Sequence, residues 1–564
     1  MSKIEIYDTT LRDGTQGEGI SFSRDDKLKV LRALDAFRID FVEGGWPGSN
    51  PKDIDFFKAA RDEPLVHTRI AAFGSTRRPE TAPEDDRNLR CLIEAATPVV
   101  TIFGKSWVLH VREIFRTTTE ENLRMISDSV RWLRAQDREV IYDAEHFFDG
   151  YRDDAEYALE TLAAAAEAGA SCLVLCDTNG GSLPRDVGRV VDVVRERLPG
   201  ARIGIHTHND GGLATANSLE AVERGAVHVQ GTFNGFGERC GNADLCNVIP
   251  NLLLKMNREL SITKDDLVHL THNSRYINAL ANQPFRENLP YVGEMAFAHK
   301  GGVHVNSVMK VARSYEHVAP DVVGNTRRVL ISELSGKSNI QHLAMAAGLD
   351  LSKHPEAAPL AVEEIKSLEN KGYVFEGAEA SSTLIILKHM GKLPEFFELI
   401  RYRTSVEHRS TGGTFTEATV KIRVGNETHL AVGEGVGPVD ALDDGMRKAL
   451  RQFYPEVEDV FLVDYKVRII NAVAGTHAKV CVHIESSDRL RDERWGTVGA
   501  SANLIEASWR ALNDSIAYGL LRKRPEIWHA HTIRDAEPDS SGSSGSEAGS
   551  EAGSKATAGA RASG

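Results

Sequence analysis

The amino-terminal half of the sequence predicts a (β/α)8 TIM barrel. Eight short apolar segments, each typical of a buried strand, occur in the first 260 residues. Between them lie amphipathic segments whose apolar residues recur every three or four positions, as in helices. Eight β/α units in about 260 residues match the usual size of such a barrel. The alternative, a doubly wound open sheet, usually has fewer strands and requires a phosphate-binding turn after its first strand, which is absent here.

The expected strands follow one another at regular spacing. In chain order they are IEIYD at 4–8, DFVEGGW at 40–46, HTRIAAF at 67–73, VVTIFG at 99–104, EVIYDAE at 139–145, CLVLCD at 172–177, RIGIHTH at 202–208 and AVHVQGTF at 226–233. The clearest helices between them are 25–37 and 153–169. Residues 261–410 are expected to be mainly helical, with loops.

The remaining residues before the tail predict a small pseudo-symmetric α+β domain. Segments with strand character, in two groups that are each followed by a helix, lie at 417–424, 427–435, 464–470, 478–486 and 493–501. A weak repeat with a shift of 62 residues matches Gly437, Leu442, Ala449 and Leu450 to Gly499, Leu504, Ala511 and Leu512. The repeat predicts two copies of one strand–helix unit.

Composition excludes several classes of function. The formal net charge is −14, which disfavours nucleic acid and anionic membranes as partners. Six cysteines in 564 residues, without a CxxC pair, predict free thiols rather than a disulfide scaffold. We find no signal-type start and no apolar run of about 18 residues, so the sequence predicts a cytoplasmic protein.

Polar side chains gather where six of the predicted strands end. They are Asp8, Arg12, Asp13, Glu43, Asp143, Glu145, Asp177, Thr178, Asn179, His206, His208, Asn209, Asp210, Asn234, Glu238 and Asn242. In a TIM barrel these positions converge on one face, which is the face that carries active sites. We therefore expect the functional site there, with Thr178 among the residues that contact the substrate.

The pattern His206-Thr207-His208 indicates a divalent metal site. Residues two apart on a strand point the same way, so the two imidazoles would project together from the barrel mouth. Asp13 and Asn242 offer oxygen ligands at other strand ends, and the set suits Mg, Mn or Zn. The alternative is a pair of histidines bonded to loop carbonyls.

Four further residues are candidates for substrate chemistry. Arg12 could hold a carboxylate or stabilise an oxyanion, or could form a structural ion pair. Glu145 could act as a general base, or be a solvated strand-end carboxylate. Phe73 and Phe103 end the third and fourth strands and could narrow the pocket, or belong to the barrel core.

Two glycine-containing strings are not taken as nucleotide sites. SGKS at 335–338 lacks the upstream glycine of a phosphate-binding loop, because Ile331 occupies that position. GEGVG at 433–437 does not follow a first strand, so a tight turn is the better interpretation.

Three segments carry a resemblance to a known family. DTTLRDGTQ at 8–16, HTHND at 206–210 and GFGERCGNADL at 235–245 resemble the Claisen-condensing acyl-CoA synthases, which have a metal-bearing TIM barrel. That family includes 2-isopropylmalate, homocitrate and citramalate synthases, and a lyase branch shares the barrel. The resemblance covers roughly residues 3–520. The segments at 42–53 and 142–151 are most similar to the citramalate branch.

The resemblance implies a reaction and roles for the site residues. A metal bound by Asp13, His206 and His208, with Asn242 close by or ligating, polarises a 2-oxo acid. Arg12 stabilises the developing alkoxide, and Glu145 removes a proton from acetyl-CoA. For the citramalate branch the acceptor is pyruvate, the thioester is hydrolysed, and the product leads to isoleucine.

The later part of the chain also fits this family. GGVHVNS at 301–307 resembles a linker loop whose His304 and Tyr315 would assist catalysis in the partner subunit's barrel, which implies a homodimer. The terminal repeat resembles a feedback-regulatory domain, for which the implied ligand is isoleucine.

The expected domains are a catalytic barrel at 1–265, helical linker subdomains at 266–410, a regulatory α+β domain at 411–530 and a disordered tail at 535–564. That tail has no Val, Ile, Leu, Met or aromatic residue and cannot offset its ordering entropy.

One departure and several rival functions stay open. Some relatives carry a tyrosine where this chain has Asp143, with Tyr142 one step away, so the role of that tyrosine does not transfer.

The nearest rival function is that of a 2-isopropylmalate synthase. A homocitrate synthase would need a cation for a distal carboxylate, and the carboxyl-terminal domain disfavours a lyase. The non-enzyme rival is an amino-acid-sensing module with an inert barrel.

Overall fold

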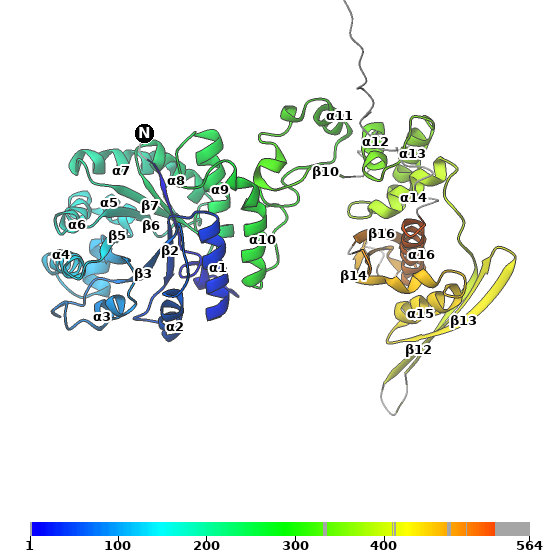
Figure 1. Ribbon diagram of the computed structural model, residues 1–564, viewed down its shortest axis with the longest axis horizontal. Coiled ribbons are helices and arrows are strands. Elements are labelled where there is room, and N and C mark those ends of the chain that lie inside the picture. The colour runs from blue at the N-terminus through cyan, green and yellow to red at the C-terminus, as the bar shows by residue number, and fades with distance from the viewer. Residues whose placement is uncertain are drawn as a thin grey trace, which may run out of the picture. The chain divides into compact units, whose positions relative to one another are not determined.

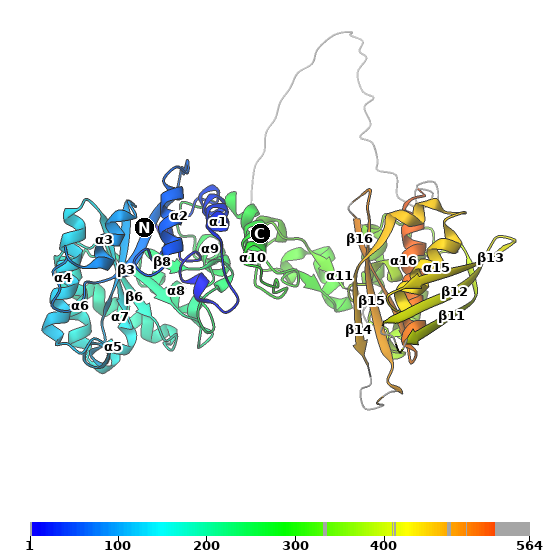
Figure 2. The same cartoon turned by 90° about the horizontal axis from the view of Figure 1, so that it is seen from below.

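The computed structural model describes residues 3–330, 336–408, 410, 413–470, 475, 477–491 and 493–524. They form two compact units, of which the first ends in sequence at Asn339 and the second continues from Ile340. Figures 1 and 2 show the two units from two directions. The tail predicted from residue 535, and Ile331 and Ser335 of the rejected phosphate loop, lie outside the described residues.

The first unit contains the predicted TIM barrel, which confirms the fold class. Eight parallel strands close in the order β1 to β8, and β8 pairs with β1. Their bounds are β1 (Glu5–Asp8), β2 (Phe41–Gly45), β3 (Arg69–Ser75), β4 (Val99–Lys105), β5 (Glu139–Glu145), β6 (Cys172–Asp177), β7 (Ile203–Thr207) and β8 (His228–Gly231). Each overlaps one of the eight strands expected from the sequence.

Helices surround the barrel (Figure 1). They are α1 (Arg24–Ala36), α2 (Pro51–Ala60), α3 (Arg87–Glu94), α4 (Thr119–Ala135), α5 (Phe147–Asp153), α6 (Ala155–Glu167), α7 (Pro184–Arg197), α8 (Ala214–Glu223), α9 (Leu245–Pro250) and α10 (Leu270–Leu280). Local sequence determines where several begin. Ser23 and Asp26 form a capping box on α1, and Asn50 caps α2 with Pro51 at its first position.

Apolar side chains plug the barrel interior below its carboxyl-terminal mouth. The plug consists of Tyr7, Phe41, Ala71, Val99, Ile141, Cys172, Val174 and Cys176. A larger apolar core lies between the strands and the surrounding helices. Because the interior is packed rather than hollow, the polar strand ends lie above a dry floor, where electrostatic interactions are stronger than in water.

After the barrel, the first unit continues with a short parallel strand pair and one helix. The pair is β9 (Ala298–His299) and β10 (Arg328–Val329), and α11 (Gly302–Lys310) lies between them in sequence. Helix α12 (Lys337–Ala346) begins at the end of the first unit and continues into the second.

The second unit repeats one motif twice. Two antiparallel sheets are each followed by a helix, and their elements are β11 (Glu398–His408), β12 (Thr414–Val424), β13 (Glu427–Gly435), α15 (Pro438–Leu450), β14 (Val460–Ile469), β15 (Val480–Asp488), β16 (Glu493–Ser501) and α16 (Leu504–Arg522). This arrangement confirms the predicted α+β domain. Strand β11 was not predicted and lies in the segment expected to be helical. It is an edge strand whose residues are exposed or half-buried. Its sequence therefore does not show the alternation of apolar and polar residues that is typical of a strand with one buried face.

Helices that precede these sheets share their core. Ile340 of α12, Ile365 of α13 (Ala357–Asn370) and Leu387 of α14 (Glu379–His389) belong to the same buried cluster as residues of α15 and α16. The apolar core of the second unit therefore begins well before its first strand. Among the described helices, none combines the length and apolar character that crossing a bilayer requires.

Candidate active site at the barrel mouth

A cavity of ≈ 180 Å³ lies at the carboxyl-terminal mouth of the barrel. Its lining comes from the ends of β1 to β7 and from the loop after β8, as expected for this fold. The residues that line it are Arg12, Asp13, Gln16, Trp46, Phe73, Phe103, Asp143, Glu145, Cys176, Thr178, His206, His208, Glu238 and Arg239. Of the eleven residues to which the sequence assigns a metal-binding, catalytic or substrate-binding role, eight line the cavity, and Asn242, His304 and Tyr315 do not.

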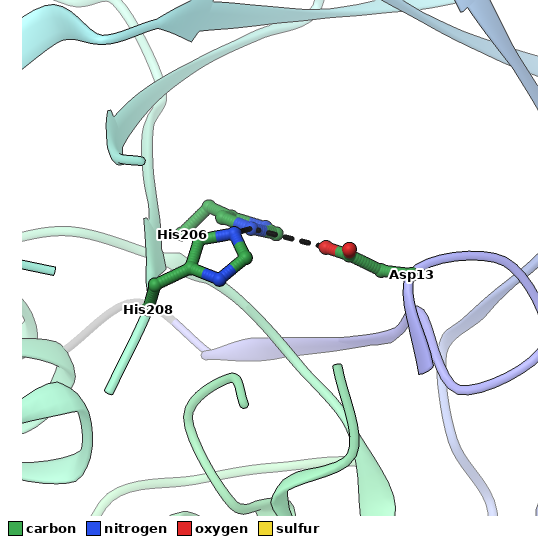
Figure 3. Close-up of side chains that lie close together, drawn as sticks. All are labelled: Asp13, His206 and His208. Carbon is green, nitrogen blue, oxygen red and sulfur yellow. Dashed lines mark hydrogen bonds and ion pairs between the residues drawn. The ribbon is translucent and has the colours of Figure 1, made fainter. Parts of the chain in front are cut away.

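Asp13, His206 and His208 meet in this cavity with their potential ligand atoms all within 4.8 Å of one another (Figure 3). His206 Nε2 lies 3.3 Å from Asp13 Oδ2 and 3.4 Å from His208 Nε2. All three residues are buried. Burial, and then the neighbouring His206, lower the pKa of His208 to about 4, so that ring is neutral at pH 7. Burial alone would raise the pKa of Asp13, but Arg12 and His206 hold it well below its usual range.

The donor set fits a divalent metal ion. Two imidazole nitrogens and a carboxylate oxygen converge, a combination that suits Zn²⁺, Mn²⁺ or Mg²⁺. Asn242 forms an isolated β-bridge with His208, and its Oδ1 is buried without a hydrogen-bond partner in the described structure. An unpaired buried carbonyl oxygen is costly, and a cation would satisfy it.

Arg12 is held in place from three sides. Its Nε donates a hydrogen bond to Glu43 Oε1, and Tyr7 Oη donates to the other oxygen of the same carboxylate at 2.7 Å. The guanidinium carbon lies 3.7 Å from the centre of the Phe73 ring. On another side, the guanidinium Nη1 is 3.5 Å from Asp13 Oδ1. The cation is therefore preorganised next to the three candidate metal ligands.

Glu145 and Thr178 lie on the adjacent strand ends. Glu145 forms an ion pair with Lys105, its direct neighbour in the β4–β5 register. The Thr178 hydroxyl accepts a hydrogen bond from the backbone amide of His146 at 2.9 Å. Lys105 was not predicted as a site residue.

Aromatic rings form one wall of the cavity. Phe73 and Phe103 stack with centroids 5.5 Å apart, and Trp46 packs edge-on against both at 5.6 and 5.5 Å. Trp46 was missed in the sequence, although it directly follows the strand at 41–45, the type of position that identified the other site residues.

His304 and Tyr315 do not line this cavity. The centres of their rings lie 4.3 Å apart in the first unit, and Tyr315 is 47% exposed. Their catalytic role therefore stays a prediction that involves a partner subunit.

Comparisons with known proteins agree with this architecture. Residues 3–276 match the HMGL-like family model, residues 291–373 match a homocitrate synthase post-HMGL domain-like model, and residues 376–520 match the LeuA allosteric (dimerisation) domain. The fold and the sequence together define a transferase class in which an HMGL-like barrel precedes a LeuA domain.

Curated relatives narrow this class. The (R)-citramalate synthases of Aquifex aeolicus and Geobacter sulfurreducens are each 50% identical over 93% of this chain and 99% of their own. A 2-isopropylmalate synthase of Ruminiclostridium cellulolyticum is 28% identical over 91% of this chain and 96% of its own. The chain belongs to the (R)-citramalate synthase family.

Proposed function

We propose that this protein is an (R)-citramalate synthase that condenses acetyl-CoA with pyruvate. The observation that carries the proposal is the convergence of Asp13, His206 and His208 with Arg12 and Glu145 in one cavity. A new bond joins the acetyl methyl carbon to the keto carbon of pyruvate. Water then cleaves the C–S bond of the thioester, so that citramalate and CoA leave. The product enters isoleucine synthesis.

A divalent ion held by Asp13, His206 and His208, with Asn242 Oδ1 as a further candidate ligand, would act as a Lewis acid on the keto group. Acetyl-CoA is the co-substrate. These donors lie at the strand ends, where the rigid barrel supports them.

The protein's own groups carry the proton and charge transfers. Glu145 accepts a proton from the methyl group of acetyl-CoA, and the ion pair with Lys105 keeps its carboxylate at the cavity. Arg12 donates hydrogen bonds to the oxygen that becomes an alkoxide, while Glu43 and Phe73 prevent the guanidinium from turning away. Thr178 lines the same cavity and contacts the oxo acid.

The functional protein is a homodimer in this proposal. The LeuA allosteric (dimerisation) domain match supports it, as does the position of His304 and Tyr315 outside the cavity lining. The two residues would complete the partner subunit's site. No nucleic acid and no membrane takes part.

We expect pyruvate to be the preferred acceptor, because a branched chain would have to fit against the wall that the rings of Trp46, Phe73 and Phe103 form. Each additional methylene group changes the difference in transition-state binding free energy between two substrates by about 1–3 kcal/mol. We therefore expect kcat/KM to be roughly 100-fold lower with 2-oxoisovalerate than with pyruvate. The measurement is release of the CoA thiol with pyruvate, 2-oxobutyrate, 2-oxoisovalerate and 2-oxoglutarate. A reversed preference would identify a 2-isopropylmalate synthase. Absence of metal-dependent CoA release with every acid would favour the sensing module.

Isoleucine should inhibit the intact protein. The two sheet–helix repeats of the second unit can form a crevice suited to a small ligand, and coupling between sites typically amounts to 1–3 kcal/mol, or about 5–150-fold in affinity. The test measures inhibition by isoleucine, leucine and valine on two forms of the protein. One is the full-length protein, and the other is a chain that ends at Asn339, the boundary between the units. A cut near Ser410 would divide the shared core of the second unit. If all three amino acids have no effect at millimolar concentration, the domain is a dimerisation platform without a ligand.

A further inference from the structure

A chain of three buried side chains runs from β5 through β8 to β7, and its two outer members, Asp143 and His206, line the cavity. Gln230 Nε2 donates a hydrogen bond to Asp143 Oδ1 at 3.0 Å, and Gln230 Oε1 lies 2.9 Å from His206 Nδ1. Asp143, Gln230 and His206 are 4%, 0% and 6% exposed. Buried polar groups of this kind are normally hydrogen-bonded, and here the three side chains bond to one another.

The direction of this chain follows from the chemistry of its first member. An ionised carboxylate only accepts hydrogen bonds, so Gln230 must turn its NH₂ group to Asp143 and its carbonyl oxygen to His206. That oxygen needs a donor, which places the proton of the neutral imidazole on Nδ1. His206 Nε2 then has a free lone pair.

The free lone pair lies where a metal would bind. His206 Nε2 is the atom 3.3 Å from Asp13 Oδ2 and 3.4 Å from His208 Nε2. A Gln230 amide turned the other way would present its NH₂ group to Nδ1 and move the ring proton to Nε2. A proton at that atom would exclude a metal ion.

We propose that Asp143 and Gln230 are positioning residues that fix the tautomer of His206 and so raise the affinity of this site for a divalent cation. The proposal rests on the proposed function only in requiring that the site binds such an ion. It also gives a role to Asp143, a cavity residue that the proposed chemistry leaves without one. Hydrogen-bond partners of this kind typically change metal affinity 10–100-fold.

The test measures Mn²⁺ dissociation constants on full-length protein by electron paramagnetic resonance of the free ion. Burial raises the pKa of Asp143 to about 7, so pH 8 keeps it mainly ionised. Gln230→Met preserves the size of the side chain and removes both hydrogen bonds, and we expect 10–100-fold weaker binding. Asp86→Asn is the matched control, because Asp86 is a buried carboxylate that caps α3 and does not line the cavity. Its dissociation constant should equal that of the wild type.

A double variant separates positioning from packing. When Gln230→Glu is combined with Asp143→Asn, the new carboxylate on β8 would accept from His206 Nδ1 and from the new amide on β5, so the polarity at His206 is retained. We expect its Mn²⁺ affinity within about threefold of the wild type, whereas Gln230→Met stays weak. Unchanged affinity in Gln230→Met, or no recovery in the double variant, would overturn the inference while the wild-type site stands. Failure of the wild type to bind Mn²⁺ would overturn the metal site of the proposed function and this inference together.

Discussion

Replacement of His206 or Asp13 by alanine should lower kcat/KM for citramalate formation by roughly 10³-fold or more. Polarisation of a carbonyl by a metal contributes several kcal/mol, and each 1.36 kcal/mol corresponds to a tenfold change in rate. Both side chains lie at the cavity above the apolar plug rather than in a hydrophobic core, so the barrel should keep its fold. The measurement is CoA release at saturating Mg²⁺ or Mn²⁺, with circular dichroism to verify folding.

Two controls accompany this result. His269→Ala makes the same change at an exposed position of the first unit and should leave turnover unaltered. EDTA should inactivate the wild type, and Mg²⁺ or Mn²⁺ should restore it. Full activity of either ligand variant would refute the assignment of the metal site.

Glu145→Gln should lower kcat by about 10²–10⁴-fold, the range for loss of a general base, with little change in the KM for pyruvate. Glutamine keeps the shape of the side chain but cannot accept the methyl proton. Glu145 is also outside the group of three metal-binding candidates, so binding of the oxo acid should persist. Steady-state kinetics with both substrates varied measures the two effects separately.

The matched control for this variant lies on the same strand. Glu139 begins β5 at the opposite end of the barrel and bonds to Arg69, so Glu139→Gln should have a kcat within about twofold of the wild type. A kcat for Glu145→Gln within threefold of the wild type would show that another group removes the proton.

Several parts of the fold and the site could be predicted because they depend on short-range patterns. Alternation along a strand places His206 and His208 on one side, whatever the rest of the chain does. The eight apolar segments and the polar residues after them predicted a barrel with one chemical face. Strand β11 was not predicted because it is an edge strand without a buried apolar face, so its sequence carries no apolar alternation to detect.

Short-range sequence patterns were enough to predict the barrel, the two-histidine motif and the position of Arg12, Asp13 and Glu145 at one mouth. Contacts between side chains of different strands could be seen only in the folded structure. The β4–β5 register pairs Lys105 with Glu145, and barrel closure brings Gln230 between Asp143 and His206. The physical reason is that local periodicity dictates which face of a strand a residue occupies, whereas register and closure depend on packing of the whole chain.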